Sequence, residues 1–352
     1  MKRVLVTGAG GPASTNFIRS LRLSPEPFYI VGTDASAIHL ALSQADVNYE
    51  VPLVSDPDYL PALNRIIDCE GVEFVHAQPD VEVMALSRNR DELHAKMLLP
   101  PHETLELCAD KMAFAGRLKE CGVPIAATFA VADEGSLAGA VESLLKEHPK
   151  VWVRARRGAG GRASLPVTEP EQAVMWARYW ETRGVPVGDF MVQEFLPGKE
   201  FAFQSLWDGG EVVTSQARER IEYLFGYLTP SGQTSSPAVA RTVHREDVNE
   251  AAAAAVLAVD AKARGIFCVD IKENTAGVPC VTEINAGRFF TTSIFFSEAG
   301  CNMPYSYTRM AYGEPLPELG QFNALPADLY WVRLMDMGDR LLQKDEWKTP
   351  LA

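Results

Sequence analysis

The sequence predicts a protein of the α/β class, with an open parallel sheet near its N-terminus followed by a region of strands and hairpins. Residues 1 to about 100 alternate short apolar strands with helical stretches, which is typical of βαβ units. From Pro149 onward, strands follow one another directly, and Asp208-Gly209 is a hairpin turn between two of them. At 352 residues, with 47% hydrophobic composition, the chain is long enough for two or three domains with substantial cores.

Composition and charge narrow the classes of partner. The net charge of −13 argues against nucleic acid or an anionic membrane as a partner, because either would need a basic face. The six cysteines are scattered, without a C-x-x-C pair or suitably spaced histidines, so neither a zinc site nor a disulfide framework is expected. Reduced thiols in the core are expected instead. The chain runs directly into a strand and has no apolar run of membrane-spanning length, so a cytoplasmic protein is expected.

The first element, VLVTGAGGPAS at residues 4–14, has the pattern of a strand, a glycine turn and a helix start. With Ala13 in the third position it fits G-x-G-x-x-G/A, and Asp34 ends the next strand where a ribose-binding acid would lie. An NAD-dependent oxidoreductase is therefore one interpretation. It also requires an acid–base group such as Tyr-x-x-x-Lys, and neither Tyr223 nor Tyr227 has a lysine four residues on.

The elements that follow are predicted from hydrophobic periodicity and from helix start and stop signals. The N-terminal region should contain strands at 4–6, 29–32 and 74–76 and helices at 16–23 and 59–69. Asp110 is a suitable N-cap for a later helix, which Gly122 and Pro124 end. An alanine-rich helix is predicted from about Glu246 to Arg264.

The stretch VWVRARRGAGGRAS concentrates arginine and glycine in a strongly acidic chain. Alternation places Arg154 on the face opposite Val151 and Val153, so it can face a cleft if the valines enter a core. The glycines that follow leave backbone N–H groups free to approach a polyphosphate. A surface loop whose arginines form exposed ion pairs is the alternative.

The hairpin FCVDIKENTAGVPCVTEIN predicts a cluster of oxygen ligands. A turn centred on Ala276-Gly277 sets Asp270 opposite Glu283, and Asn285 shares the face of Glu283. Two facing carboxylates repel unless a cation lies between them, and oxygen donors of this kind suit Mg²⁺ that carries phosphate. An outer face with solvated charges is the alternative.

These motifs together resemble the ATP-grasp superfamily, in the branch that contains the carbamoyl phosphate synthetase large chain, biotin carboxylase and small carboxylate–amine ligases. The resemblance covers about residues 1 to 315 and rests on the N-terminal domain, Asp110-Lys111, the Arg154 strand with its glycine loop, MVQEFLPGKE, Asp270, TEIN and SEAGCNMPY. It implies an ATP-grasp fold preceded by a Rossmann-like parallel-sheet domain. The implied domains are residues 1–100 (Rossmann-like), 101–190 (small lobe with a glycine-rich lid) and 191–352 (large lobe with the metal site).

The resemblance also implies roles for individual residues. Phosphate binding is implied for Lys111, Arg154 and the lid glycines Gly158, Gly160 and Gly161. Adenine binding is implied for the hinge Gln193, Glu194, Phe195 and Leu196, with backbone groups of Glu194 and Leu196 reading the adenine edge, and ribose binding for Glu200. Mg²⁺ binding is implied for Asp270, Glu283 and Asn285, and stabilisation of the acyl phosphate and the tetrahedral intermediate for Arg288. The structural alternatives are a core-capping Lys111, an edge-strand Glu200 and a surface Arg288.

The sequence departs from the family pattern at two places. Relatives read E-x-N-P-R, whereas E-I-N-A-G-R here lacks the proline and displaces Arg288 by one position. In the loop TPSGQTSSPAVART, Pro230 falls where carbamoyl phosphate synthetase has a histidine, which argues against bicarbonate chemistry. The aromatic residues Tyr223, Phe225, Tyr227, Phe289 and Phe290 fit either a partly apolar substrate or a core.

The activity that the resemblance implies is that of a ligase. ATP would activate a carboxylate as an acyl phosphate, and an amine would then displace phosphate. The implied cofactors are ATP and two Mg²⁺ ions, for which Mn²⁺ could substitute. The alternatives are bicarbonate activation, a non-catalytic ATP-binding sensor and the NAD-dependent oxidoreductase. In this family the N-terminal domain binds no NAD, and its glycine loop lies near the acceptor site. Gly10, Gly11 and the helix start after Pro12 would therefore offer N–H groups to an anionic acceptor. A homodimer through that domain is expected.

Overall fold

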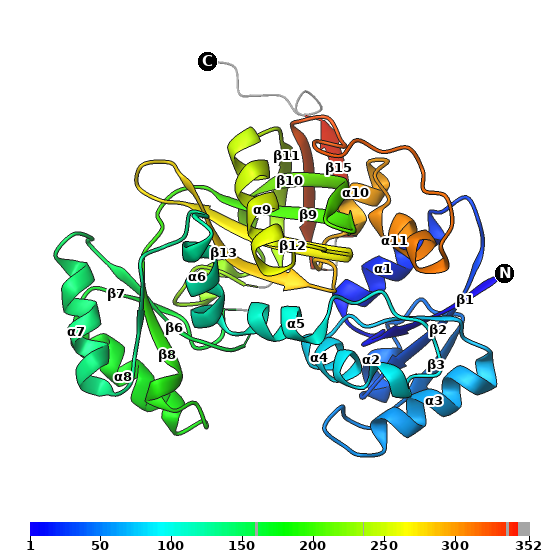
Figure 1. Ribbon diagram of the computed structural model, residues 1–352, viewed down its shortest axis with the longest axis horizontal. Helices are drawn as coiled ribbons and strands as arrows, with labels where there is room; N and C mark the ends of the chain where they lie inside the picture. Colours follow the sequence, from blue (N-terminus) through cyan, green and yellow to red (C-terminus); the bar gives the residue numbers. More distant parts are fainter. Residues whose placement is uncertain (159–160, 235, 336–337, 344–352) are drawn as a thin grey trace.

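The strands form three sheets in the computed structural model, which describes residues 1–158, 161–234, 236–335 and 338–343 (Figure 1). The first sheet is parallel, and the other two are antiparallel. This arrangement confirms the predicted α/β class with a parallel sheet at the N-terminus. None of the helices among these residues is long and apolar enough to cross a membrane.

The N-terminal sheet has four strands in the order β3-β2-β1-β4. Its strands and helices are β1 (Lys2–Thr7), α1 (Pro12–Arg22), β2 (Phe28–Asp34), α2 (Ala37–Leu40), β3 (Val47–Glu50), α3 (Tyr59–Glu70), β4 (Phe74–His76) and α4 (Asp80–Arg88). The three predicted strands and two predicted helices are all present, whereas β3 was not predicted. Because β3 is only four residues long and pairs only with β2, its sequence carries little hydrophobic signal.

The small lobe contains the second sheet, in the order β5-β8-β6-β7, with two helices on it (left in Figure 1). Its elements are β5 (Thr128–Ala130), α7 (Glu134–Leu145), β6 (Val151–Ala155), β7 (Leu165–Val167), α8 (Pro170–Glu181) and β8 (Phe190–Glu194). Val151 and Val153 are fully buried in a core that belongs to this lobe alone, as their alternation with Arg154 predicts.

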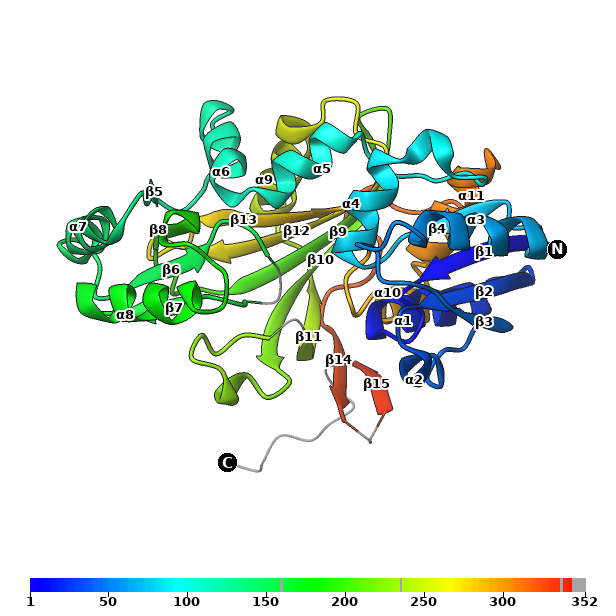
Figure 2. The same cartoon turned by 90° about the horizontal axis from the view of Figure 1, so that it is seen from below.

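The third sheet is the largest, with seven strands in the order β13-β12-β9-β10-β11-β14-β15. They are β9 (Glu200–Asp208), β10 (Glu211–Tyr223), β11 (Pro237–Val243), β12 (Gly265–Glu273), β13 (Pro279–Ala286), β14 (Leu329–Leu334) and β15 (Gly338–Gln343). One face packs against α5 (His102–Ala109), α6 (Lys111–Glu120) and α9 (Glu246–Val259), and the other against α10 (Ile294–Glu298) and α11 (Met303–Tyr312). Figure 2 shows the N-terminal sheet at one end of this sheet and the small lobe at the other.

The hydrophobic cores show which parts are tightly joined. Two clusters of buried apolar side chains each run from the N-terminal sheet into the large sheet, on opposite faces. The small lobe shares neither cluster. Its position relative to the rest therefore depends mainly on the connecting segments and on polar contacts across the pocket.

Two predicted features differ from the structure. Helix α9 ends at Val259 rather than near Arg264, because Asp260 is extended and its carboxylate and carbonyl accept bonds from Lys262 N and Ala263 N. All six cysteines are free, as predicted, but Cys69 and Cys121 are exposed rather than core residues.

Candidate active site

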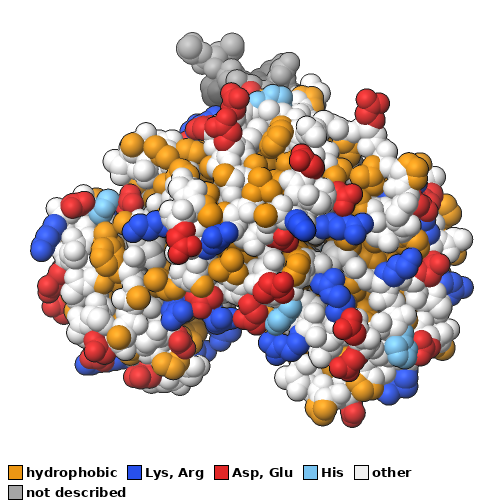
Figure 3. Space-filling model, in the orientation of Figure 1, with side chains coloured by type: hydrophobic (Ala, Val, Ile, Leu, Met, Phe, Trp, Pro, Cys, Tyr) orange, Lys and Arg blue, Asp and Glu red, His pale blue; other side chains and the backbone are white. Residues whose placement is uncertain are grey.

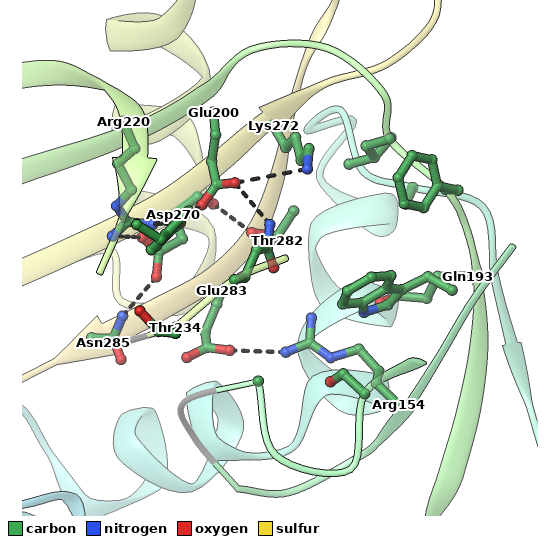
Figure 4. A pocket seen from close by; sticks show the side chains of 18 of the residues that line it. Arg154, Gln193, Glu200, Arg220, Thr234, Asp270, Lys272, Thr282, Glu283 and Asn285 are labelled. Atoms are coloured by element: carbon green, nitrogen blue, oxygen red, sulfur yellow. Dashed lines mark hydrogen bonds and ion pairs between the residues drawn. The ribbon is translucent and has the colours of Figure 1, made fainter. Parts of the chain in front are cut away.

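A cavity of about 480 Å³ lies where the small lobe faces the large sheet (Figure 4). Side chains from β6 and β8 line one side, and side chains from β9, β10, β12 and β13 line the other. Asp80, at the start of α4, closes one end from the N-terminal part of the chain. Figure 3 shows the molecule indented between the small lobe and the N-terminal lobe, with Lys and Arg side chains on both sides of the indentation.

The predicted oxygen ligands come together in this cavity. Asp270 lies opposite Glu283 in the β12–β13 ladder, which confirms the predicted register. Asn285 donates from Nδ2 to Asp270 Oδ2 at 3.1 Å. A bulge after Asp270 leaves Thr282 as an extra residue, whose hydroxyl donates to the carbonyl oxygen of Asp270 at 3.0 Å. The register therefore holds at the site and shifts by one residue toward the turn.

Each of the two carboxylates has cationic partners. Arg220 Nη2 lies 2.6 Å from Asp270 Oδ1, and Arg154 Nη2 lies 3.1 Å from Glu283 Oε2. Burial raises the pKa of Asp270 more than Arg220 lowers it. Burial also favours a raised pKa at Glu283, but Lys111, Arg154 and Arg288 outweigh it, and the pKa of Glu283 is lowered. Glu283 is thus held as an anion at the centre of the site.

Lys111 is the first residue of α6, and the helix cap directs it into the site. Asp110 is the N-cap, as predicted, and accepts bonds from Met112 N and Ala113 N. Lys111 Nζ donates to Gly158 O at 2.6 Å and lies 3.6 Å from Glu283 Oε2. Burial, together with the nearby Arg154, lowers the pKa of Lys111 despite Glu283. Lys111 therefore connects the glycine-rich segment to the oxygen cluster. These contacts lie in the site, so Lys111 does more than cap the core, which was the structural alternative.

Gly161, in the glycine-rich segment, lines the cavity and lies beside the loop that follows β10. Gly158 and Gly161 have φ values of 112° and 69°, which residues other than glycine rarely adopt. A Cβ at Gly161 would lie 3.9 Å from Ser231 Oγ and 4.0 Å from Gln233 O. Gly160 lies outside the described residues.

The predicted adenine hinge lines the cavity with Gln193, Glu194, Phe195 and Leu196. Leu196 forms a small apolar cluster with Ala126 and Cys280. The N–H of Glu194 donates to Ala127 O at 2.8 Å, because the hinge runs beside the start of β5. That N–H is therefore unable to read an adenine edge, which corrects part of the prediction for Glu194.

Glu200 lies on β9, a central strand between β12 and β10, so the edge-strand alternative is wrong. It faces the cavity, opposite Phe201 and Phe203, which are core residues. Its carboxylate accepts bonds from Tyr223 OH and from Gln233 Nε2, the latter at 2.8 Å.

Two cations also lie beside the Glu200 carboxylate. Arg220 Nη1 is 3.2 Å from Oε1, and Lys272 Nζ is 3.7 Å from Oε2. Glu200 on β9 pairs with Lys272 on β12 and with Arg220 on β10. The register of these three strands therefore places the two cations on either side of the carboxylate.

Arg288 lines the cavity despite its displacement in the E-I-N-A-G-R segment, so the surface alternative is wrong. Its guanidinium contacts Asp80 through Nε and donates to Asn285 Oδ1 through Nη2. Of the aromatic residues with two interpretations, Phe289 is buried in the core, Phe290 is in the cavity wall, and Tyr227 is 82% exposed.

In the N-terminal glycine loop, neither Gly10 nor Gly11 offers the free N–H group that was predicted. Gly10 N donates to Asp34 Oδ2 at 3.2 Å, and Gly11 N donates to Gly8 O at 2.8 Å. A Cβ at Gly10 would lie 2.4 Å from His39 O, and one at Gly8 would lie 2.5 Å from Pro79 Cγ. The absence of side chains at Gly8 and Gly10 allows this close approach of Pro79 and the backbone of His39. The loop therefore serves packing.

Sequence reasoning missed several residues of the cavity: Asp80, Trp152, Arg220, Gln233 and Lys272. Lys272 carries a signal, because it alternates with the buried Ile271 and Glu273 on a strand next to Glu200. Arg220 carries none, because its neighbours Glu219 and Ile221 are not buried. The pairing of Lys272 and Arg220 with Glu200 is long-range, however, and no pattern in the sequence specifies which strands are neighbours. Asp80 comes from another part of the chain, and only the fold brings it to Arg288.

Comparisons with known proteins agree with this geometry. A sequence model described as the ATP-grasp domain matches residues 108–292, more than half of the chain. A search of curated proteins finds no significant match. Among solved structures, the biotin carboxylase domain of Hydrogenobacter thermophilus 2-oxoglutarate carboxylase is similar, with a TM-score of 0.71 and 20% identity over 94% of this chain and 73% of that one.

Two further solved structures have the same fold. N5-carboxyaminoimidazole synthetase from Staphylococcus aureus has a TM-score of 0.69 and 15% identity, over 94% of this chain and 81% of that one. L-amino acid ligase from Bacillus licheniformis has a TM-score of 0.62 and 15% identity, over 94% and 79%. The fold is thus the predicted ATP-grasp fold preceded by a parallel-sheet domain, and the chain belongs to the ATP-grasp family.

Proposed function

We propose that this protein is an ATP- and Mg²⁺-dependent ligase that activates a carboxylate as an acyl phosphate and couples it to an amine, with release of ADP and phosphate. The observation that carries the proposal is the position of Glu283. It is a half-buried anion with Lys111 and Arg154 on one side and the Asp270–Asn285 pair on the other. Cations and oxygen donors around one cavity suit a nucleotide polyphosphate with its metal.

The residues present fit Mg²⁺. No group of three or more His, Cys, Asp or Glu side chains suited to a metal occurs among the described residues. Mg²⁺ needs less from the protein, because it keeps waters and takes phosphate oxygens alongside one or two carboxylates. We assign it to Asp270, Glu283 and Asn285, where it would supply charge neutralisation for the phosphates.

The chain's own residues account for the phosphoryl transfer step. Lys111 and Arg154 would bind phosphate oxygens and neutralise charge on the transferring group, a step that depends on positioning and electrostatics. The glycine-rich loop that Lys111 contacts through Gly158 would cover the phosphates. A carboxylate oxygen of the substrate then bonds to the γ-phosphorus, and the bond to ADP breaks.

Arg288 is positioned for the second step. The amine bonds to the acyl carbon, and Arg288 stabilises the tetrahedral anion through the guanidinium that now contacts Asn285. The carbon–oxygen bond to phosphate then breaks, and the amine gives up a proton, leaving an amide. No nucleophilic side chain is needed in this route.

Two of the similar structures support the proposed chemistry, one through its bound nucleotide and the other through its described activity. The Hydrogenobacter domain was solved with MgADP, ADP and bicarbonate, and the Bacillus protein is described as an L-amino acid ligase. We propose small-molecule carboxylate and amine substrates for this chain. The domain limits 1–100, 101–190 and 191–352, the homodimer and the cytoplasmic location stay predictions.

The test combines ligand-dependent melting with turnover. Mg·ATP at a hundred times its Kd should raise Tm by roughly 2 °C or more, and NAD⁺ or NADP⁺ should leave it unchanged. Amino acids and other small acids and amines are then screened for ADP release. Glu283→Gln should abolish ADP release by removing the central anion. Near-normal turnover in that variant, or a nicotinamide-dependent shift without an ATP shift, would contradict the proposal.

A matched control is available on the surface. Glu134 forms an ion pair with Arg178 at 2.6 Å, and neither residue lines the cavity. Glu134→Gln removes the same charge from an exposed pair. It should leave both the melting shift and the turnover unchanged.

A further inference from the structure

Arg218 is a buried cation beside the site, and none of the described residues gives it an acidic partner. It lies on β10 and is 1% exposed. Among the described residues no carboxylate pairs with it, and its Nε and Nη2 atoms have no hydrogen-bond partner. Its Nη1 donates a long bond of 3.5 Å to the carbonyl oxygen of Thr292. Burying a charge in this way is costly unless another charge compensates it.

The surroundings of Arg218 offset only part of that cost. Its guanidinium carbon lies 5.1 Å from the ring centres of both Phe290 and Phe296, so it lies against two aromatic rings. Burial, and then the neighbouring Arg220, lower the pKa of Arg218 to about 9. Arg220, two residues away on the same face, has both Asp270 and Glu200 as partners.

Arg218 lies immediately behind the cavity wall. The ring of Phe290 lines the cavity, and its centre is 5.1 Å from Arg218 Cζ and 5.2 Å from Arg220 Cζ. Figure 4 places Arg220 and Asn285 on the side of the cavity away from Gln193 of the adenine hinge. A turn of one ring would therefore open Arg218 to the substrate end of the cavity.

Other unpaired polar groups occur in the segment that contacts Arg218. Thr292 and Ser293 are fully buried, and their hydroxyl oxygens have no partner among the described residues. Buried hydroxyls and a buried guanidinium without partners are rare in folded proteins, and each is expected to have a bound group or water. The missing group in this place is an acceptor with negative charge.

We propose that Arg218 binds a carboxylate of the substrate that takes no part in the reaction. The proposal rests on the proposed ligase function, in which the reacting carboxylate lies beside Asp270, Glu283 and Arg288. Because Arg218 is one ring farther away, it binds a second carboxylate. The substrate class is therefore a dicarboxylic acid, or an amine that itself carries a carboxylate, as an amino acid does.

The test uses melting in the presence of Mg²⁺ and a non-hydrolysable ATP analogue. The added probes are glutarate, glycine, acetate and methylamine, which separate a dicarboxylate and an amino acid from a single acid and a single amine. Glutarate or glycine should raise the Tm of the wild type by roughly 2 °C or more at saturation, and acetate and methylamine should not. Which of the two acts identifies the source of the second carboxylate.

Two variants separate a binding role from a structural one. Arg218→Met removes the charge and keeps an unbranched side chain. Without ligand it should melt at or above the wild-type Tm, because an uncompensated buried charge is gone, and it should lose the response to the probe. Arg178→Met, which removes an exposed arginine, should keep that response.

The outcomes are distinct. If Arg218→Met melts lower and still responds to the probe, or if no probe raises the wild-type Tm while the ATP analogue does, the inference is wrong and the proposed function stands. If the ATP analogue itself gives no Mg²⁺-dependent shift in the wild type, the proposed function fails first.

Discussion

His76 makes the stability of the fold sensitive to acid. It ends β4, is fully buried, and its ring stacks on Phe17 at 3.9 Å between centres with 14° between planes. Phe289 and Tyr307 pack against it edge-on, so three rings surround it where the N-terminal sheet meets the large lobe. Nε2 lies 2.9 Å from Gln78 Oε1, and Nδ1 has no partner among the described residues. This environment favours the neutral ring.

The size of the effect follows from the pKa. Burial lowers the pKa of His76 from its ordinary 6.5 to about 4, against a smaller opposing effect of Gln78. The unfolded chain therefore binds a proton below pH 6.5 that the folded chain binds only near pH 4. The stabilisation is fully present above pH 6.5 and is lost as the pH falls toward 4. At pH 5 the loss amounts to about 2 kcal/mol.

His76→Phe tests this, because it keeps a ring on Phe17 and removes the titrating group. Urea unfolding at pH 7.5 and pH 5 gives the change in the free energy of unfolding for each protein, whatever the substitution costs at neutral pH. The wild type should lose about 2 kcal/mol more than the variant. His39→Gln, which removes an exposed histidine, should behave as the wild type. Equal losses in wild type and His76→Phe would refute the argument.

Two further predictions concern the glycine loop and the phosphate-binding lysine. Gly10→Ala should lower the free energy of unfolding by about 1–3 kcal/mol in urea titrations, because its Cβ would meet the backbone of His39. Gly116→Ala, in α6 with open space around it, is the control and should not destabilise. Lys111→Met should lower the rate of ADP release about a hundredfold, and an unchanged rate would contradict the role given to Lys111.

Local patterns predicted the parts of the site that lie on one hairpin or one helix start. Asp270 faces Glu283 because the turn fixes the register and because Val269 and Ile271 must enter the core. The cap at Asp110 follows from side-chain chemistry within one turn of helix. In both cases the determining interactions are short-range.

The sequence could not predict the features that depend on packing between distant segments of the chain. The loop at Gly10 has the pattern of a dinucleotide site, yet its N–H bonds to Asp34, and the backbone of His39 fills the space beside it. The same pattern of glycines serves either a ligand or a close packing contact, and only the neighbouring segments distinguish them. The bulge at Thr282 likewise depends on how β13 meets its partner strand.

The unpaired charge at Arg218 follows from the register of three strands. On β12, β9 and β10, Lys272, Glu200 and Arg220 lie side by side, so this row alternates in charge. The next row is Asp270, Ala202 and Arg218, in which a small alanine separates the two charged residues.

Asp270 pairs with Arg220 from the first row, which leaves Arg218 without a partner in the second. A cation bound at Asp270 would weaken its hold on Arg220, and that guanidinium would then be available to phosphate or to the substrate. The two arginines would in this way act one after the other. Arg220 would respond first, to the metal and nucleotide, and Arg218 would then bind the carboxylate of the substrate. Binding of Mg·ATP should therefore precede a strong response to the carboxylate probe, and a probe response of equal size without nucleotide would contradict this coupling.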